Sequence, residues 1–270
     1  MNQPLKPFVT YKQDGQMQSE IMDWVLVEEP LQISVVSGQK RLELGVFLRT
    51  PGEDRALVCG LLRTSGIWDG HAEINVELSS SHGECGQATV TLSDPSGLAD
   101  RADRLSLVHA GCGWCGSDLT EWACDQFVRP NDSFQISLIA LRHGFGAFSL
   151  GQKCFSQSGG SHAAGLLNAQ GELLLLAEDV GRHNAVDKVI GLHILGTKGP
   201  FGARALLLSG RAGFELVYKA AMVGIPLVAS LGAPSSSAIE LAREAGLTLI
   251  SFVKDNRLNV YTHRQRFIHS

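Results

Sequence analysis

Apolar and polar residues alternate in short runs through the first third of the chain, and this period of two predicts β-strands. The runs lie at residues 31–36, 41–49, 72–78 and 87–92. Between the second and third runs, five apolar residues recur at helical spacing, so residues 55–65 predict a helix that ends before Gly66. We therefore expect a smaller α+β domain dominated by antiparallel strands. Residues 1–26 are polar and show no period, which predicts a tail or an edge element.

After Pro130 the pattern changes to short apolar runs that alternate with amphipathic helices. The apolar runs lie at 173–176, 205–208, 227–229 and 247–253, and the predicted helices lie at 184–195, 214–223 and 236–245. This alternation is typical of βαβ crossovers around a buried, mostly parallel sheet. A helix over 134–141 capped by Asp132 or Ser133, a short helix after the glycines at 159–160, and a last strand at 259–262 complete the prediction. The expected fold class is α/β, or α+β overall, with one domain at residues 1–129 and a larger one at 130–270.

Composition narrows the classes of function. Hydrophobic residues make up 44% of the 270 residues, charged residues 19%, and the net charge is -4, so we expect neither a nucleic-acid partner nor a membrane partner. No segment reaches the ~18 consecutive apolar residues of a membrane span, and residues 1–20 contain no apolar signal-like run. A cytoplasmic protein is expected. A chain with this much core does not need disulfides, so its six cysteines are interpreted as reduced thiols.

Two cysteines are spaced for chemistry. Cys112 and Cys115 lie in the sequence CGWCG, whose glycines allow a tight turn that holds both sulfurs close together. This spacing suits a dithiol redox site, half of a zinc site, or a carrier that accepts sulfur as a persulfide. A glycine-rich loop with two idle thiols is the simpler alternative. His71 and Glu73 resemble the His-x-Glu half of a zinc deaminase signature, although Gly111 stands where that signature has proline.

The densest group of ionisable residues lies at 178–188, in the sequence EDVGRHNAVDK. It follows an apolar run and precedes a predicted helix, and the carboxyl ends of strands in open α/β sheets are where ligand crevices form. Arg182 and His183 are candidates for anion contacts. The structural alternative is equally well supported by spacing alone: Asp179 caps the helix, while Arg182 and Asp187 solvate its outer face.

Three further turns could bind a nucleotide. The glycine- and serine-rich turns at 209–215 and 232–237 lead into helices and could cradle a phosphate, although each alone is weak evidence. The loop at 252–257 combines an aromatic face with charges: Phe252 for stacking on a purine or pterin, Asp255 for ring N–H groups, and Lys254 or Arg257 for phosphate. A solvated β-turn is the alternative for this loop.

Taken together, these residues resemble the FdhD family of formate dehydrogenase accessory sulfurtransferases. The resemblance is carried by the run EDVGRHNAVDKVIG at 178–191, the CGWCG at 112–116, the GGSHAA at 159–164, Ser209 to Arg211 and the NVYT at 259–262. It extends in order over nearly the whole chain and includes EPL at 29–31 and RTPG at 49–52. It implies a cytidine-deaminase-like, three-layer larger domain without zinc, and no metal ligands are expected.

The resemblance also implies a reaction and its partners. Sulfur would come from a cysteine desulfurase as a persulfide on Cys112, assisted by Cys115, and pass to the molybdenum cofactor before that cofactor enters formate dehydrogenase. The cofactor, a molybdenum bis(pterin guanine dinucleotide), would be bound as substrate, and a guanine nucleotide is expected to be able to substitute for it. The implied cofactor-binding residues are Phe252, Val253, Lys254, Asp255, Asn256 and Arg257 on the guanine part, with Arg182 and His183 at the turn. A homodimer is implied as well.

Two alternatives remain open at this point. The protein could bind the molybdenum cofactor as a chaperone without transferring sulfur, its cysteines then serving only as redox sensors. A zinc-dependent deaminase is the third reading, and a metal analysis would test it.

Overall fold

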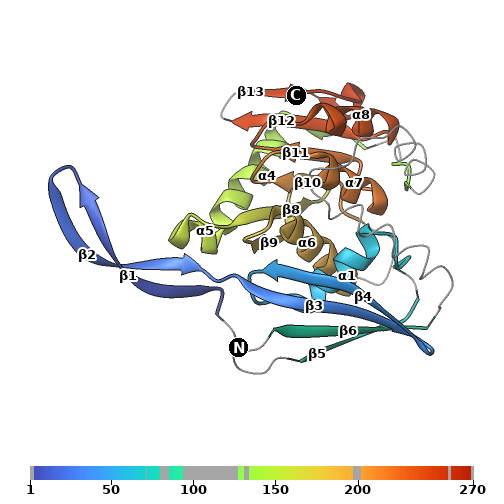
Figure 1. Ribbon diagram of the computed structural model, residues 1–270. Helices are drawn as coiled ribbons and strands as arrows, with labels where there is room; N and C mark the ends of the chain where they lie inside the picture. The colour runs from blue at the N-terminus through green and yellow to red at the C-terminus, as the bar shows by residue number, and fades with distance from the viewer. Residues whose placement is uncertain are drawn as a thin grey trace.

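The computed structural model describes residues 3–70, 72–79, 85–93, 127–130, 134–196, 202–254 and 257–268. Within these ranges the chain is a mixed α+β protein whose strands form four sheets. Two of these sheets carry the cores of the molecule: a four-stranded sheet from the first third of the chain and a six-stranded sheet from the rest. In Figure 1 the six-stranded sheet lies above the four-stranded sheet, with α1 and α6 between them.

The four-stranded sheet has the order β4-β3-β6-β5. Its strands are β3 (Glu29–Ser37), β4 (Lys40–Arg49), β5 (Ile74–Ser79) and β6 (Gly86–Leu92), and helix α1 (Asp54–Thr64) packs on one face. All five predicted elements are confirmed. The pair β3 and β6 is parallel and the other two pairs are antiparallel, which agrees with the mainly antiparallel sheet expected from the sequence. Leu57, Val58 and Leu61 of α1 are buried against this sheet.

Residues 1–26 lie mostly outside the core, as expected, but they form neither a tail nor an edge of a larger sheet. Strands β1 (Leu5–Asp14) and β2 (Met17–Leu26) pair antiparallel over ten residue pairs as a long hairpin, which we call the arm. Figure 1 shows the arm extending away from the rest of the molecule. Both faces of the arm are largely exposed, so its residues are under no requirement to alternate between buried and solvated, and the sequence therefore shows no period of two.

The six-stranded sheet has the order β13-β12-β11-β10-β8-β9. The strands are β8 (His162–Leu167), β9 (Leu173–Asp179), β10 (Ala205–Leu208), β11 (Leu227–Ser230), β12 (Thr248–Lys254) and β13 (Arg257–Val260). The pairs β10–β11 and β11–β12 are parallel and the other three are antiparallel, so the sheet is mixed and the expectation of a mostly parallel sheet is confirmed only in part. Strand β8 lies between β9 and β10 and is antiparallel to both. Strands β9, β10, β11 and β12 therefore all run in the same direction, although β9 does not pair with β10.

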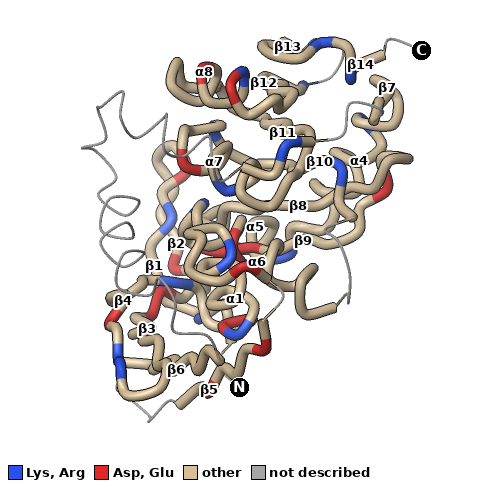
Figure 2. Tube along the Cα trace, turned by 90° about the vertical axis from the view of Figure 1, so that its right-hand side faces the viewer, with Lys and Arg blue, Asp and Glu red and all other residues tan. Residues whose placement is uncertain are grey.

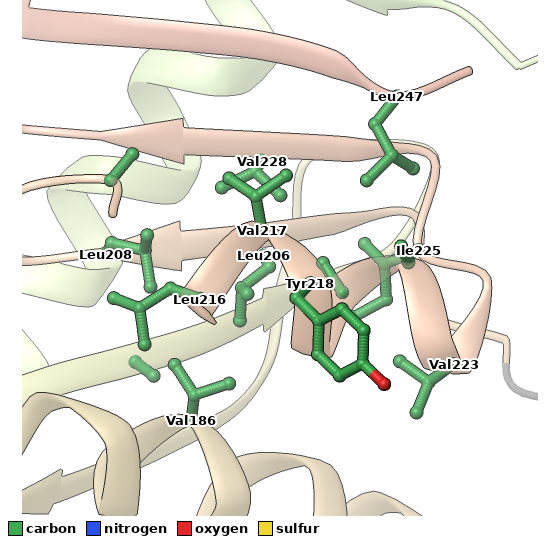
Figure 3. Packing of buried hydrophobic residues seen from close by; sticks show 14 of the residues in the cluster. Val186, Leu206, Leu208, Leu216, Val217, Tyr218, Val223, Ile225, Val228 and Leu247 are labelled. Carbon is green, nitrogen blue, oxygen red and sulfur yellow. The ribbon is translucent and has the colours of Figure 1, made fainter. Parts of the chain in front are cut away.

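Helices cover both faces of this sheet. On one face lie α6 (Arg182–Gly196), α7 (Phe214–Val223) and α8 (Ser236–Glu244); on the other lies α4 (Leu138–Gly151). Figure 3 shows the core between the sheet and helices α6, α7 and α8, to which Val186, Val217 and Val228 from α6, α7 and β11 belong. In β10, Leu206 belongs to one core and Leu207 to the other, which is the alternation expected of a strand buried on both sides. The result is three layers.

Two element boundaries differ from the sequence prediction. Helix α4 starts at Leu138 and is capped by Ser137, whose Oγ accepts from the N–H of Ala140, whereas Asp132 and Ser133 lie outside the described residues. The short helix α5 (Lys153–Ser158) ends before the two glycines, and the residues after them form β8. Both differences come from long-range pairing: β7 (Ile136–Ser137) pairs with β14 (Phe267–Ile268), and β8 is paired on both sides.

Glycines let α1 and α6 approach closely. A Cβ on Gly60 would lie 1.9 Å from the carbonyl oxygen of Asp187, and a Cβ on Gly191 would lie 1.9 Å from that of Ala56. The backbones of the two helices are therefore in direct contact. The division into domains at residue 129 stays a prediction. No helix among the described residues is long and apolar enough to cross a membrane.

Candidate functional site

The carboxyl ends of β9, β10, β11 and β12 lie at one edge of the six-stranded sheet, which we call the carboxyl edge. Strands β8 and β13 run the other way, so their first residues lie at this same edge. His162 pairs with Asp179, and Arg257 pairs with Lys254. Loops that follow strands at such an edge are where open α/β sheets bind ligands.

Three of the six ionisable residues at 178–188, Asp179, Asp187 and Lys188, are buried and hydrogen-bonded inside the protein. The Asp179 carboxylate accepts from the Lys188 ammonium at 2.8 Å, from the Thr50 N–H at 3.1 Å and from the Gly181 N–H at 2.9 Å. Asn184 donates to the same carboxylate, and Lys188 also donates to the Thr50 carbonyl at 2.8 Å. Thr50 lies in the turn between β4 and α1. Asp179 and Lys188 therefore bind the turn at the end of β4 to the six-stranded sheet.

Asp187 and Glu178 are structural too. The Lys219 ammonium of α7 lies 2.7 Å from both Asp187 carboxylate oxygens, and the Thr64 hydroxyl donates to one of them at 2.8 Å. Glu178 accepts from the backbone N–H groups of Cys154 and Phe155, each at 2.8 Å. The suggestion that Asp187 solvates the outer face of α6 was wrong, because its side chain is buried between α1 and α7.

Arg182 and His183 are half-exposed. His183 Nε2 lies 2.6 Å from a carboxylate oxygen of Glu215, at the first turn of α7. This hydrogen bond, partly opposed by burial, lowers the pKa of Glu215, so the carboxylate is ionised at neutral pH. Figure 2 shows basic and acidic positions gathered along the backbone around α6.

His162 joins this group from the start of β8. Burial lowers its pKa, and the positive charges of Arg182 and His183 lower it further. The His162 ring is therefore neutral at pH 7, with one nitrogen free to accept a hydrogen bond. A Cβ on Gly210 would lie 3.4 Å from its Nδ1, which shows that the ring packs beside the turn after β10.

At the other part of the edge, the hairpin of β12 and β13 presents Phe252. The expectation of one loop over 252–257 was wrong, because Phe252, Val253 and Lys254 belong to β12 and Arg257 begins β13. The φ of Phe252 is +57°, a left-handed conformation that costs a side chain about 1–3 kcal/mol, and the residue is 41% exposed. The pairing of β12 with β13 is irregular between Ser251 and Lys254, which accommodates this residue. Lys254 and Arg257 are exposed, the Val253 side chain is buried in the core, and Asp255 and Asn256 lie outside the described residues.

The two groups of candidate residues share the edge but are not in contact. Four strand spacings separate β9 from β12, or roughly 19 Å at about 4.8 Å each. Between them lies Arg211, exposed after β10. The edge thus carries a row of basic residues, which we call the basic row: Arg182, His183, Arg211, Lys254 and Arg257.

The turns at 209–215 and 232–237 are less available for phosphate than their composition suggests. Gly232 N–H donates to Gly210, Ala212 N–H to Ala233, and Ser235 N–H to Ala212, so these donors are used within the two turns. The Ser235 hydroxyl accepts from the Ala238 N–H and caps α8. A Cβ on Gly232 would lie 2.8 Å from the Arg211 nitrogen, so the glycine is needed for the turns to pack together. What they contribute to the edge is mainly the Arg211 side chain.

Cys112 and Cys115 lie outside the described residues, as does Cys124. Among the described thiols, Cys59 and Cys154 both have a pKa raised to about 11, by burial for Cys59 and by burial together with the nearby Glu178 carboxylate for Cys154. Both are protonated at neutral pH and are poor nucleophiles. Cys85 is half-buried, and its S–H donates to the Gly86 carbonyl.

The sequence analysis did not select His162 or Glu215 as site residues. His162 follows a glycine-rich run and starts an apolar strand, which is the one local signal that could have singled it out. Glu215 had no such signal, because its contact with His183 spans 32 residues. Within the described ranges, no group of three or more histidine, cysteine, aspartate or glutamate side chains could hold a metal ion, and His71 lies outside those ranges.

Comparisons with known proteins agree on one family. The model of the FdhD/NarQ family matches residues 26–268. The sulfur carrier protein FdhD of Picrophilus torridus is 38% identical over 257 residues, covering 94% of this chain and 95% of its own. The protein of the same name from Mycolicibacterium paratuberculosis is 37% identical over 252 residues, covering 90% and 91%.

A solved structure has the same fold. It is the crystal structure of a protein assigned as a formate dehydrogenase accessory protein from Desulfotalea psychrophila. The TM-score is 0.76 at 24% identity, over 98% of this chain and 100% of that one.

Proposed function

This chain belongs to the FdhD/NarQ family, and from that premise we propose that it is a sulfur carrier that serves formate dehydrogenase. It accepts sulfur from a cysteine desulfurase as a persulfide and transfers it to the molybdenum cofactor, acting as a sulfurtransferase. The observation that carries the proposal is the basic row along the carboxyl edge, which suits a long, multiply charged anion such as a pterin guanine dinucleotide.

The two ends of the edge take different parts of that substrate. Phe252, exposed and held in a strained conformation, stacks on the guanine, while Lys254 and Arg257 bind its phosphates. Arg182 and His183, roughly 19 Å away at the other end, bind a second anionic part. Val253 contributes its backbone, and Asp255 and Asn256 act in the same loop. The substrate spans the sheet edge, and this accounts for two separated groups of basic residues.

Cys112 is the proposed carrier. Persulfide formation needs a thiolate, and the raised pKa values of Cys59 and Cys154 make those thiols unsuitable. The Cys112 thiolate attacks the outer sulfur of the desulfurase persulfide, forming Cys112–S–SH and releasing the desulfurase thiolate. Cys115 then attacks the inner sulfur, so a Cys112–Cys115 disulfide forms and sulfide leaves for the molybdenum. A cellular dithiol must reduce the disulfide before the next cycle.

Formation of a persulfide adduct tests whether Cys112 is the carrier. The protein is incubated with cysteine and a cysteine desulfurase, and intact mass spectrometry then measures the persulfide adduct, about 32 Da for one sulfur on a thiol. Cys112→Ala is expected to abolish the adduct, whereas Cys85→Ala, the matched control, should keep it. A wild-type protein that binds guanine nucleotide without ever forming the adduct would instead be a cofactor chaperone, and full adduct on Cys112→Ala would reject Cys112 as carrier.

The remaining expectations follow from the same proposal. The larger domain would share the cytidine deaminase fold without its zinc. Reduced thiols are maintained in the cytoplasm, so the reaction is placed there. The active form is expected to be a homodimer.

A further inference from the structure

The arm has an apolar face that is largely exposed in the single chain. Residues directly opposite each other in a hairpin share a face, and the pairs Pro7–Trp24, Val9–Met22 and Tyr11–Glu20 place five apolar residues along one side. Tyr11 is 76% exposed and Trp24 43%. We call this side the arm stripe. A contiguous exposed apolar surface of this kind marks an interaction site, and a two-stranded hairpin is only marginally stable by itself.

A second unpartnered apolar surface lies on the body of the same chain. Along α4, Ile139, His143, Gly146 and Leu150 are exposed at spacings of four, three and four residues, which places them on one face of the helix. Leu150 is 88% exposed, and Phe155 of the neighbouring α5 is exposed as well. We call this surface the α4–α5 stripe.

The arm and the α4–α5 segment also carry opposite net charge. Residues 138–158 contain Arg142, His143 and Lys153 and no aspartate or glutamate. The arm carries two lysines against three carboxylates, which are Asp14, Glu20 and Asp23. An acidic arm and a basic helix pair attract each other and favour one register of contact.

Within one chain only the base of the arm contacts α5, and the rest of the arm extends away from the body (Figure 1). Two copies related by a two-fold axis would bury both stripes, because each arm would lie on the α4–α5 stripe of the other copy. The arm spans residues 5–26, and a stable interface uses about 20–30 residues on each side. We propose that two copies of this chain exchange arms, the arm stripe of each covering the α4–α5 stripe of the other.

The exchange would be built beside the candidate site. The base of the arm contacts α5, and a Cβ on Gly160 would lie 3.6 Å from the Cβ of Leu26. Gly160 lies two residues before His162, the first residue of β8 at the carboxyl edge. The inference deepens the homodimer expected under the proposed function by assigning its interface, and a measurement of mass is independent of sulfur transfer.

Sedimentation of the full chain at several concentrations tests the exchange. The wild-type protein is expected to be a dimer, and the double variant Tyr11→Lys, Trp24→Lys should dimerise ~30-fold or more weakly, the effect of losing a central aromatic contact. Phe8→Lys, on the opposite face of the arm, is the matched control and should dimerise as the wild type does. All three positions are exposed in the single chain, so thermal unfolding should confirm that each variant folds. A monomeric wild type, or an equally stable dimer of the double variant, overturns the proposal.

Complementation separates arm-to-body from arm-to-arm contact. Leu150→Lys alters the α4–α5 stripe and should also weaken the dimer. Mixing this variant with the arm variant allows a heterodimer that keeps one intact contact between an arm and a body. The mixture is therefore expected to dimerise more tightly than either variant alone. No gain on mixing would contradict the exchange.

Discussion

The buried half and the exposed half of the segment at 178–188 use similar residues for different ends. Asp179, Asp187 and Lys188 are at most 2% exposed. They form hydrogen bonds inside the protein, with Thr50, Thr64 and Lys219. Arg182 and His183 lie on the same short stretch and stay half-exposed at the carboxyl edge. Charge density alone does not identify a binding site. An ionisable side chain can bind a ligand only if it stays accessible and is not already buried against partners inside the protein.

The largest expected effect breaks a buried ion pair. Lys219→Met leaves the Asp187 carboxylate buried without its cation, which should lower the free energy of unfolding by about 3–5 kcal/mol. Arg41→Ala is the control, because Arg41 and Glu43 are paired at 2.7 Å with side chains 56% and 48% exposed. That surface pair should contribute no more than about 1 kcal/mol. Urea unfolding measures both, and equal losses would mean that burial does not separate the two kinds of pair.

The next effect tests the contact that brings α1 onto α6. Gly191→Ala forces a methyl group against the carbonyl of Ala56, and such overpacking should cost about 1–3 kcal/mol. The matched control is Gly146→Ala in α4, where a Cβ meets nothing within 4 Å. That substitution should stabilise the helix by about 0.5–1 kcal/mol. Opposite signs in urea unfolding are expected, and a neutral Gly191→Ala would show that the helices can separate without cost.

On the exposed side, loss of one cation from the basic row should weaken the binding of guanosine diphosphate. Lys254→Ala is expected to raise the dissociation constant about tenfold, or about 1.4 kcal/mol. Lys40→Ala removes an exposed lysine from the start of β4, far along the chain from the carboxyl edge, and should leave binding unchanged. Isothermal titration measures both. If Lys254→Ala binds guanosine diphosphate as tightly as the wild type, the end of β12 is not part of the proposed site.

The smallest effect concerns the hydrogen bond between His183 and Glu215. Because the folded-state pKa of Glu215 is lowered, the stability from this contact is present above the unfolded value of about 4.3 and is lost as pH falls through the folded value. Glu215→Gln should therefore lower the melting temperature slightly at pH 7 and have little effect near pH 3. A difference between wild type and variant that does not change with pH would contradict an ionised Glu215.

The sequence by itself determined much of this protein. Period-two and helical patterns located β3 to β6 and α1, and the alternation after residue 173 located α6, α7, α8 and their strands, because those elements bury one face or both against a core. The run at 178–191 and the cysteine pair were enough to indicate the family. Their closeness in sequence also placed Phe252, Lys254 and Arg257 in one hairpin, at the end of β12 and the start of β13.

Tertiary structure decided what depends on distant partners. The direction of β8, the pairing of β7 with β14 and the start of α4 follow from strand pairing between segments far apart in the chain. The long-range contacts of Asp179 with Thr50 and of His183 with Glu215 divided one charged segment into a structural half and an accessible half. Sequence spacing cannot specify these contacts, because the free energy of an ionisable side chain depends on its burial and its neighbours, and both are set only when the sheets and helices pack together.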